Sequence, residues 1–357
     1  MTRAGGELEV AFMKVAVLTG GGDCPGLNAV IRAVVRRASA HGFEMMGLRD
    51  GWKGLLDDNH FRLTRETTSG ILHRGGTILG TSRVNPFKVE NGLERVKRAI
   101  ERNEIHAVIA IGGEGTLSAA TRMSQEGVRI VGVPKTIDND LNGTDFTFGF
   151  DTAVGIATEA IDRLHSTAES HKRVIVCEVM GRHVGWIATY AGLAGGADVI
   201  LVPEVPADLE RVAEHIKHRH ASGRTFSIVV VAEGTRIKLS HEGQEQLITS
   251  GALDEAGRPR LGGVGALLAN EIERRTGYET RVSVLGHIQR GGAPTAHDRV
   301  LATRYGVHAC DMVAQGEFGK MAALRGNEIV SVDLSEATRE LKKVPQEFFQ
   351  VAQVFFG

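Results

Sequence analysis

The sequence predicts an α/β fold, and three observations support this prediction. Short apolar runs of strand length recur along the chain, helical spacing of apolar residues lies between them, and glycine-rich turns join the two patterns. Near-continuous apolar strands are typical of doubly wound parallel sheets that helices cover on both faces. The chain has 357 residues, and a single core rarely grows past ~250 to 300 residues, so two domains are expected.

The expected strands are short runs rich in β-branched residues. They occupy residues 14–19, 105–111, 129–133, 173–179, 226–232 and 281–285. Helices are expected after the first strand, where an apolar stripe runs from Leu27 to Ala38, and again where Ala153 to Leu164 repeat the helical spacing. Ligands of open α/β sheets bind outside the carboxyl ends of the strands, so the turns after these strands are the places to search.

Composition limits the classes of partner. Lys and Arg number 42 against 43 Asp and Glu, with a formal charge of −1, which argues against nucleic acid as a general partner. Cys24, Cys177 and Cys310 are too scattered for a disulfide framework or a zinc cluster. No apolar run approaches the ~20 residues of a membrane helix. We expect a cytoplasmic protein without a membrane partner, in which residues 1–12 are an extension without function and Met13 is an alternative start.

The first glycine-rich turn contains Gly20, Gly21 and Gly22. Glycines let backbone N–H groups face an anion at a helix N-terminus, so this turn could hold a phosphate. Pro25 stands where the third glycine of a dinucleotide-binding G-x-G-x-x-G would be, and no G-x-x-x-x-G-K-[ST] occurs. A nicotinamide dehydrogenase is therefore disfavoured, while a purely structural turn remains an equal alternative for these glycines.

The second glycine-rich turn, residues 112–116, places Glu114 at the start of an expected helix. A carboxylate close to bound phosphates suits Mg²⁺, which typically takes one or two protein carboxylates together with phosphate oxygens and water. Helix capping by an acid in the first turn is the alternative, and this turn alone does not decide between them.

Residues 134–140, "PKTIDND", end an apolar strand with two carboxylates. Burying a carboxylate costs several kcal/mol unless it is paired or metal-bound, so such a strand end suggests a site. Asp138 could act as the general base for a hydroxyl nucleophile, with Thr136 as a hydrogen-bond donor and Asp140 as a neighbour or metal-site acid. Lys135 could contact phosphate as a point charge. A turn built on an Asx motif is the alternative, but it does not explain this combination of residues.

Further cations follow other expected strands and turns. Arg83, Arg182 and the pair His287 and Arg290 lie in glycine-containing stretches. A single arginine more often forms a surface ion pair of small energetic weight. Their recurrence together with carboxylates and glycine turns indicates phosphoryl transfer, in which catalysis is mostly positioning and charge neutralisation.

Seven segments resemble, in order, the motifs of the 6-phosphofructokinases: "GGDCPGLNA", "RGGTILGTSR", "GGEGT", "PKTIDND", "SHKRV", "EVMGRHVGW" and "TRVSVLGHIQRGG". The resemblance spans roughly Val15 to Val313. It implies phosphorylation of D-fructose 6-phosphate at its 1-hydroxyl, with Mg²⁺ as cofactor. It also implies two doubly wound α/β domains with the active site in the cleft between them. The phosphoryl-donor domain would comprise residues 1–148 and about 288–338, and the sugar-phosphate domain residues 149–287 and about 339–357.

The resemblance also implies roles for individual residues. Asp138 matches the proton acceptor, accompanied in catalysis by Thr136, Asp140 and Arg182. The ATP-binding positions are Gly22, Arg83, Val84, Gly113, Glu114, Gly115 and Thr116, with Glu114 at the family's magnesium aspartate. The substrate-binding positions are Thr136, Ile137, Asp138, Arg173, Met180, Gly181, Arg182, Glu233, Arg281, His287, Ile288, Gln289 and Arg290. Arg173 and Arg281 match arginines that a neighbouring subunit supplies, so a homo-oligomer is expected, with a tetramer favoured over a dimer.

Two positions that correlate with donor choice in this family disagree here. ATP-using members commonly have glycine at both, pyrophosphate-using members have aspartate and lysine, and this chain has Gly115 and Lys135. An aspartate at 115 would add bulk and negative charge near the α-phosphate of a nucleotide, and exclusion of that kind outweighs one added flexible cation. We expect ATP, as in the mixed-substrate, actinobacterial-type branch that carries both motifs. The alternatives are a reversible pyrophosphate-dependent enzyme and a catalytically silent binding subunit.

Overall fold

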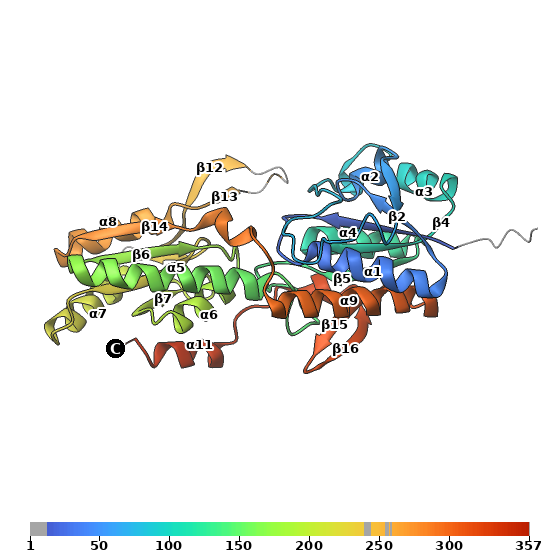
Figure 1. Cartoon of the computed structure of the whole chain (residues 1–357). Coiled ribbons are helices and arrows are strands. Elements are labelled where there is room, and N and C mark those ends of the chain that lie inside the picture. Colours follow the sequence, from blue (N-terminus) through green and yellow to red (C-terminus); the bar gives the residue numbers. More distant parts are fainter. Residues whose placement is uncertain (1–12, 239–243, 254–256, 258, 357) are drawn as a thin grey trace, which may run out of the picture.

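The computed structural model describes residues 13–238, 244–253, 257 and 259–356. In Figure 1 the chain forms two lobes, each with a mainly or wholly parallel sheet between layers of helices. The expected extension without function, residues 1–12, lies outside the described residues.

The first sheet is parallel in its centre and antiparallel at both edges. Its strands in spatial order are β16 (Glu328–Asp333), β15 (Lys320–Arg325), β5 (Ile130–Pro134), β4 (Ile105–Gly112), β1 (Lys14–Gly20), β2 (Glu44–Leu48) and β3 (His60–Leu63). All pairs from β15 to β2 are parallel, whereas β16 and β3 pair in the antiparallel sense. The carboxyl ends of β1, β4 and β5 therefore lie at one edge of the sheet, as a ligand site of this fold class requires.

Helices cover both faces of the first sheet. They are α1 (Leu27–His41), α2 (Lys53–Leu56), α3 (Gly92–Arg102), α4 (Glu114–Gln125), α9 (Ala296–Gln315) and α10 (Glu336–Arg339). Successive strand side chains point to opposite faces, so Val15 and Val17 of β1 join the core beneath α1 and α9, while Ala16 and Leu18 join the core beneath α3 and α4. The apolar stripe of α1 is buried as predicted, and the helix ends at His41, followed by Gly42 with a left-handed φ of 70°.

The second sheet is parallel throughout. Its strands in spatial order are β14 (Thr280–Val284), β6 (Val174–Val179), β9 (Ser227–Ala232) and β7 (Val199–Leu201). The helices of this lobe are α5 (Phe150–His171), α6 (Trp186–Ala194), α7 (Leu209–Ala221), α8 (Val264–Thr276) and α11 (Gln346–Gln353). Ile175 and Ile228 join the core beneath α5 and α6, and Val174 and Val229 join the core beneath α7 and α8. Short strands complete the lobe, namely β8 (Ala207–Asp208), β10 (Arg236–Lys238), β11 (Glu245–Leu247), β12 (Thr249–Leu253) and β13 (Pro259–Leu261).

The chain passes between the lobes more than once. After β14 and the short 3₁₀ helix η2 (Gly286–Arg290), α9 packs against α1 of the first lobe, and α11 then packs against α6 and β7 of the second. Residues far apart in sequence therefore meet between the two sheets. Among the helices that the structure describes, none is both long and apolar enough to cross a membrane.

The prediction of an α/β fold is confirmed, and the expected strands correspond to β1, β4, β5, β6, β9 and β14. The expectation that helices cover both faces of each strand is wrong for β14. Val282 is 39% exposed and Val284 is 56% exposed. β14 lies at the edge of its sheet, with β6 as its one partner among the described strands, and an apolar sequence does not distinguish an edge strand from a central one.

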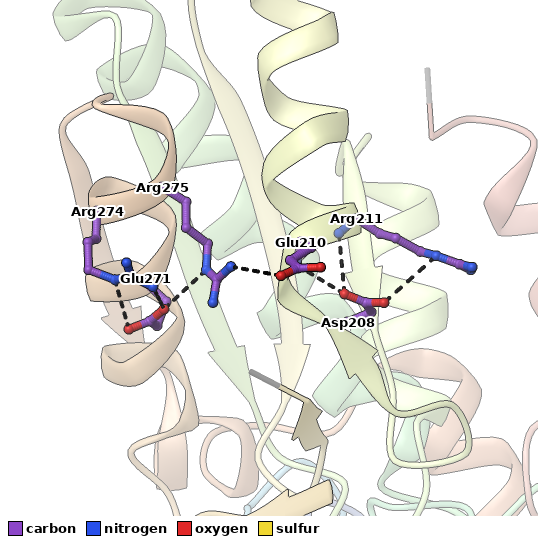
Figure 2. A network of polar contacts seen from close by, with 6 residues as sticks. All are labelled: Asp208, Glu210, Arg211, Glu271, Arg274 and Arg275. Carbon is purple, nitrogen blue, oxygen red and sulfur yellow. Dashed lines mark hydrogen bonds and ion pairs between the residues drawn. The ribbon is translucent and has the colours of Figure 1, made fainter. Parts of the chain in front are cut away.

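The two outer helices of the second lobe, α7 and α8, carry a network of charged side chains (Figure 2). Glu271 forms ion pairs with Arg274 at 2.8 Å and with Arg275 at 3.1 Å. Arg275 also approaches Glu210 of the neighbouring helix at 4.0 Å. Asp208 caps α7, since its carboxylate accepts a hydrogen bond of 3.0 Å from the backbone N–H of Glu210. Opposite charges are thus matched on this outer face of the lobe.

Candidate active site

A cavity of about 400 Å³ lies at the carboxyl ends of strands from both lobes. Its walls are the turns that follow β1, β4, β5 and β6, together with η2, a segment after β3, and Leu341 near the C-terminus. The lining residues are Gly21, Gly22, Ser82, Arg83, Val84, Asn85, Lys88, Val89, Gly113, Glu114, Gly115, Thr116, Lys135, Thr136, Asp138, Asp140, Arg182, His183, Arg290 and Leu341. This is the position at which sheets of this class bind ligands.

The glycine turn after β1 is packed against two cations. Gly21 has a left-handed φ of 82°, which glycine adopts without strain. A Cβ on Gly22 would lie 2.6 Å from Nη1 of Arg290, so a side chain at this position would displace the guanidinium. The ammonium group of Lys135, which is only 2% exposed, donates a hydrogen bond to the carbonyl oxygen of Gly22. The turn therefore fixes Lys135 and Arg290 at the cavity wall.

The turn after β4 leads directly into a helix whose N-terminus faces the cavity. α4 begins at Glu114, after the N-cap residue Gly113. The first backbone N–H groups of a helix have no partner within the helix, and its dipole is positive at this end, so an anion is favoured here. Thr116 of this helix packs tightly against the ends of β1 and β4, because a Cβ on Gly20 or Gly112 would lie 2.5 or 2.3 Å from its side chain.

The turn after β5 presents a carboxylate that is almost buried. Asp138 is 9% exposed, and its Oδ1 has no hydrogen-bond partner among the described residues. The loop is shaped by Asn139, which has a left-handed φ of 53°, and by the backbone N–H of Asp138, which donates to Oγ1 of Thr136 at 3.1 Å. Burial raises the pKa of Asp138, while the nearby Arg290 and Lys135 oppose that rise. An unpartnered buried oxygen in this position can accept a proton from a bound hydroxyl.

Two further acids, Asp140 and Glu233, interact electrostatically with Asp138. Desolvation and the neighbouring Asp138 carboxylate raise the pKa of Asp140 to about 7. The same two causes raise the pKa of Glu233 to about 7. Like charges this close disfavour full ionisation of the group, and clusters of perturbed acids within a cavity are typical of functional sites.

The turn after β6 is pressed against the end of β9. A Cβ on Gly234 would lie 1.6 Å from the carbonyl oxygen of Arg182, so residue 234 must be glycine for this contact. Arg182 itself has a left-handed φ of 46°, a conformation that a non-glycine residue rarely adopts. Its Nε approaches Nε2 of His183 at 3.3 Å. The packing of the two strand ends thus directs the Arg182 turn to the cavity.

The structure brings together all of the positions predicted for the donor and for catalysis, but not all of those predicted for the sugar phosphate. Ile137 and Gln289 are fully buried, whereas Ile288 is 69% exposed. His287 is also exposed. The predicted positions outside the cavity lining are Ile137, Arg173, Met180, Gly181, Glu233, Arg281, His287, Ile288 and Gln289.

Arg173 and Arg281 lie at the opposite end of the second sheet. They stand at the amino ends of β6 and β14, while the cavity lies beyond the carboxyl ends of the strands. The six residues of β6 span about 20 Å. Both arginines form ion pairs with Glu279 of their own chain, at 2.7 and 2.5 Å. Within one chain these two side chains therefore do not reach the site.

Some lining residues were not predicted from the sequence. Asn85, Lys88 and Val89 follow the Arg83 stretch directly, and His183 follows Arg182, so an extension of the motifs by a few positions would have included them. Leu341 carried no such signal. It reaches the cavity because it forms an isolated bridge with Leu141, 200 residues earlier in the chain.

The carboxylates present fit Mg²⁺ bound together with phosphate. Glu114 lines the cavity and is close enough to contribute to the raised pKa of Asp140. In the part of the chain that the structure describes, no group of three or more His, Cys, Asp or Glu side chains could hold a metal ion by itself. Mg²⁺ usually takes one or two carboxylates and completes its shell with phosphate oxygens and water.

Comparisons with known proteins agree with this chemistry. The family model described as Phosphofructokinase matches residues 14–313. The chain is 58% identical over 346 residues to the pyrophosphate–fructose 6-phosphate 1-phosphotransferase of Amycolatopsis methanolica, covering 97% of this chain and 100% of that protein. It is 53% identical over 342 residues to the ATP-dependent 6-phosphofructokinase 3 of Streptomyces coelicolor, covering 96% and 99%.

Among solved structures, Pichia pastoris phosphofructokinase in the T-state has a TM-score of 0.80 and 32% sequence identity, covering 96% of this chain and 36% of the Pichia chain. The fold, the motifs and both relatives lead to the same assignment. This chain belongs to the phosphofructokinase family.

Proposed function

We propose that the protein transfers the γ-phosphoryl group of ATP to the 1-hydroxyl of D-fructose 6-phosphate, giving D-fructose 1,6-bisphosphate and ADP. The observation that carries this proposal is the buried carboxylate of Asp138, whose Oδ1 is unpartnered among the described residues. Lys135, Arg182 and Arg290 line the same cavity. The proposed reaction is a glycolytic step that takes place in the cytoplasm.

In this proposal Asp138 accepts the proton of the sugar 1-hydroxyl. The hydroxyl oxygen bonds to the γ-phosphorus, and the bond from that phosphorus to the leaving oxygen of ADP breaks. Arg290 and Lys135 favour the ionised form of Asp138, in opposition to burial, which raises its pKa. Arg182 offsets the negative charge that spreads over the transferred group. Thr136 and Asp140 complete the loop around the base, and Asp140 with a pKa of about 7 can share the released proton.

We assign the donor to the first lobe. Gly22, Arg83, Val84 and residues 113–116 would hold ATP, because they form the wall that contains the N-terminus of α4. Glu114 would hold Mg²⁺, which supplies charge neutralisation for the phosphate oxygens when it is bound. Residues 1–148 and about 288–338 would form this donor domain.

We assign the sugar phosphate to the second lobe, residues 149–287 and about 339–357. The side chains and turns nearest the base would bind it, which includes the Arg182 turn, Arg290 and Glu233. Support comes from the shared surroundings of these groups, since Asp138 raises the pKa of Glu233 and Arg290 lowers it. The remaining sugar-phosphate positions would be Met180, Gly181 and His287 of this lobe, together with Thr136, Ile137, Ile288 and Gln289 of the first lobe.

ATP is the proposed donor because of the surroundings of Gly115 and Lys135. Gly115 is exposed at the cavity wall and adds no side chain there. The ammonium of Lys135 is buried and donates to the carbonyl oxygen of Gly22, so this cation is engaged within the protein. The second candidate is a reversible pyrophosphate-dependent enzyme, which Lys135 itself favours. The relatives bear both names.

The deciding experiment is a parallel assay of fructose 1,6-bisphosphate formation by the purified protein with Mg²⁺ and either ATP or pyrophosphate. We expect kcat/KM for ATP to exceed that for pyrophosphate by about 100-fold, and the variant Gly115→Asp to lose at least about tenfold with ATP. Turnover with pyrophosphate alone would establish the second candidate instead. No turnover with either donor would favour a silent binding subunit.

A homo-oligomer, with a tetramer favoured over a dimer, is the proposed active form. Arg173 and Arg281 lie far from the cavity of their own chain, and exposed Val282 and Val284 follow Arg281 on the edge strand β14. We expect light scattering to give a mass at least twice that of the 38.3 kDa chain. Mixing the variants Asp138→Asn and Arg281→Ala should restore part of the activity, because some shared sites then contain both intact residues. A fully active monomer would contradict this.

A further inference from the structure

The C-terminal segment 341–344 crosses between the lobes at the edge of the cavity. Leu341 lines the cavity and forms an isolated bridge with Leu141. The next residue, Lys342, donates its backbone N–H to the carbonyl oxygen of Asp140 at 2.9 Å. The backbone of this segment is thus bonded directly to the loop that carries the proposed base.

The side chain of Lys342 holds the same loop through three hydrogen bonds. Its ammonium group donates to Oδ1 of Asn139 at 3.0 Å and to the carbonyl oxygens of Thr144 and Asp145 at 2.9 and 2.7 Å. These three acceptors match the three donors of an ammonium group. Asn139 lies between the two aspartates and has a left-handed φ of 53°, a conformation that asparagine adopts more readily than other non-glycine residues and that its bond to Lys342 helps to hold here.

The other side of Lys342 is bound to the second lobe. Its carbonyl oxygen accepts a hydrogen bond of 2.7 Å from Nε1 of Trp186, and its ammonium lies 5.3 Å from the centre of that indole ring. The segment is held a second time by Glu204, whose Oε1 accepts from the N–H groups of Val344 and Gly185, each at 3.0 Å. Gly185 and Trp186 directly follow the Arg182 turn.

We infer that Lys342 is a positioning residue that fixes the Asp138 loop of the first lobe against the Arg182 turn of the second. The inference rests on the proposed role of Asp138 as general base. If the three donors of Lys342 were removed, Asn139 could relax from its left-handed conformation and shift the adjacent carboxylate. A displacement of about 1 Å at a reacting group can lower a rate by about 100-fold, whereas substrate binding depends on many contacts that Lys342 does not make.

The first test compares Lys342→Met with Lys343→Met in the full-length protein. Methionine keeps an unbranched stem and removes the donors, and Lys343 is an exposed lysine at the next position. We expect Lys342→Met to lower kcat by about 30-fold, with the KM values for fructose 6-phosphate and ATP changed less than about threefold. We expect Lys343→Met to match the wild type. Wild-type kcat in Lys342→Met would overturn the inference.

A double-mutant cycle separates positioning from a general loss of structure. In the Asp138→Asn background the carboxylate is already absent, so Lys342→Met should lower kcat by less than about threefold. The same 30-fold loss in that background would overturn the inference, because Lys342 would then act independently of Asp138.

A third variant covers the case in which Lys342→Met does not fold. Trp186→Phe keeps a ring but removes the Nε1–H bond to Lys342, and we expect kcat to fall by about threefold with unchanged KM values. Unchanged kcat in this variant would count against the inference. Inactivity of the wild type with both donors would instead overturn the proposed function itself, and would be seen before any variant is tested.

Discussion

Two charged clusters of this molecule differ in how their charges are matched. On the outer face of α7 and α8, Glu271 is paired with Arg274 and Arg275 (Figure 2), and its pKa is lowered by those partners. In the cavity cluster, which joins Asp138 and Asp140 of the cavity lining to the nearby Glu233, desolvation and the carboxylate of Asp138 raise the pKa values of Asp140 and Glu233 to about 7. The outer network therefore favours the charged form of its acid, while the cavity cluster keeps acids where their charged forms are disfavoured.

The difference follows from position in the fold. The outer pairs within α8 are three or four residues apart, a spacing that brings side chains together on a helix that water still reaches. The cavity cluster forms where strand ends of two sheets converge, so its acids approach one another whatever their local sequence prefers. Acids held in this way reduce stability, and clusters of this kind are typical of functional sites.

The largest effect is expected from Asp138→Asn, which keeps the shape of the side chain and removes the base. We expect kcat to fall by about 100-fold or more, the range for loss of a general base, with no loss of thermal stability. Steady-state kinetics and a thermal melt measure the two quantities. A variant that retains most of its kcat would show that Asp138 has no catalytic role. The cavity cluster would then differ from the outer network in its pKa values but not in function.

The next effect is expected from Arg182→Met, with Arg211→Met of the outer network as its matched control. Arg182 lines the cavity, so we expect about a tenfold fall in kcat and about a tenfold rise in KM for fructose 6-phosphate. Arg211 pairs with Asp208 at 3.8 Å on the exposed face, and its loss should leave both constants unchanged. Equal kinetics in the two variants would contradict the assigned site.

A smaller effect, on stability, is expected from Glu233→Gln. The pKa of Glu233 is raised from 4.5 to about 7 in the folded protein, so the stability that its protonated form contributes is complete below pH 4.5 and is lost as the pH rises through 7. The neutral glutamine avoids that loss. We expect the free energy of unfolding, from urea titration, to rise by on the order of 1 to 2 kcal/mol at pH 8 and to be unchanged at pH 4. Destabilisation at pH 8 would argue that Glu233 is well paired.

The smallest effect, and the opposite pH dependence, is expected from Glu271→Gln. Hydrogen bonds from Arg274 and Arg275 lower the pKa of Glu271 below 4.5, so its contribution is present above pH 4.5 and is lost as the pH falls through the lowered pKa. We expect a loss of about 0.5 to 1 kcal/mol at pH 7, which decreases at acid pH and in high salt. A loss that is independent of pH would show that packing, and not charge, accounts for the contribution of Glu271 to stability.

Part of the candidate site could be predicted because it is made of short segments. The glycine turns, "PKTIDND" and the Arg182 turn follow strands whose composition is recognisable, so their approach to one cavity follows from the α/β fold. The surroundings of Lys135 could not be predicted. Its sequence position suggested a free cation for phosphate, whereas the structure buries it and bonds it to the Gly22 carbonyl, since only the folded chain brings β5 beside the turn after β1.

The sequence by itself determined the fold class, the turns that line the cavity and the resemblance to the phosphofructokinases, because backbone preferences and the spacing of apolar residues act over a few positions. The tertiary structure decided that β14 is an exposed edge, that Arg173 and Arg281 lie away from the cavity, and that Lys342 is bound to a loop about 200 residues earlier. It also decided the raised pKa values of Asp138, Asp140 and Glu233. Desolvation and long-range contacts depend on segments that meet only in the folded chain, so no local pattern encodes them.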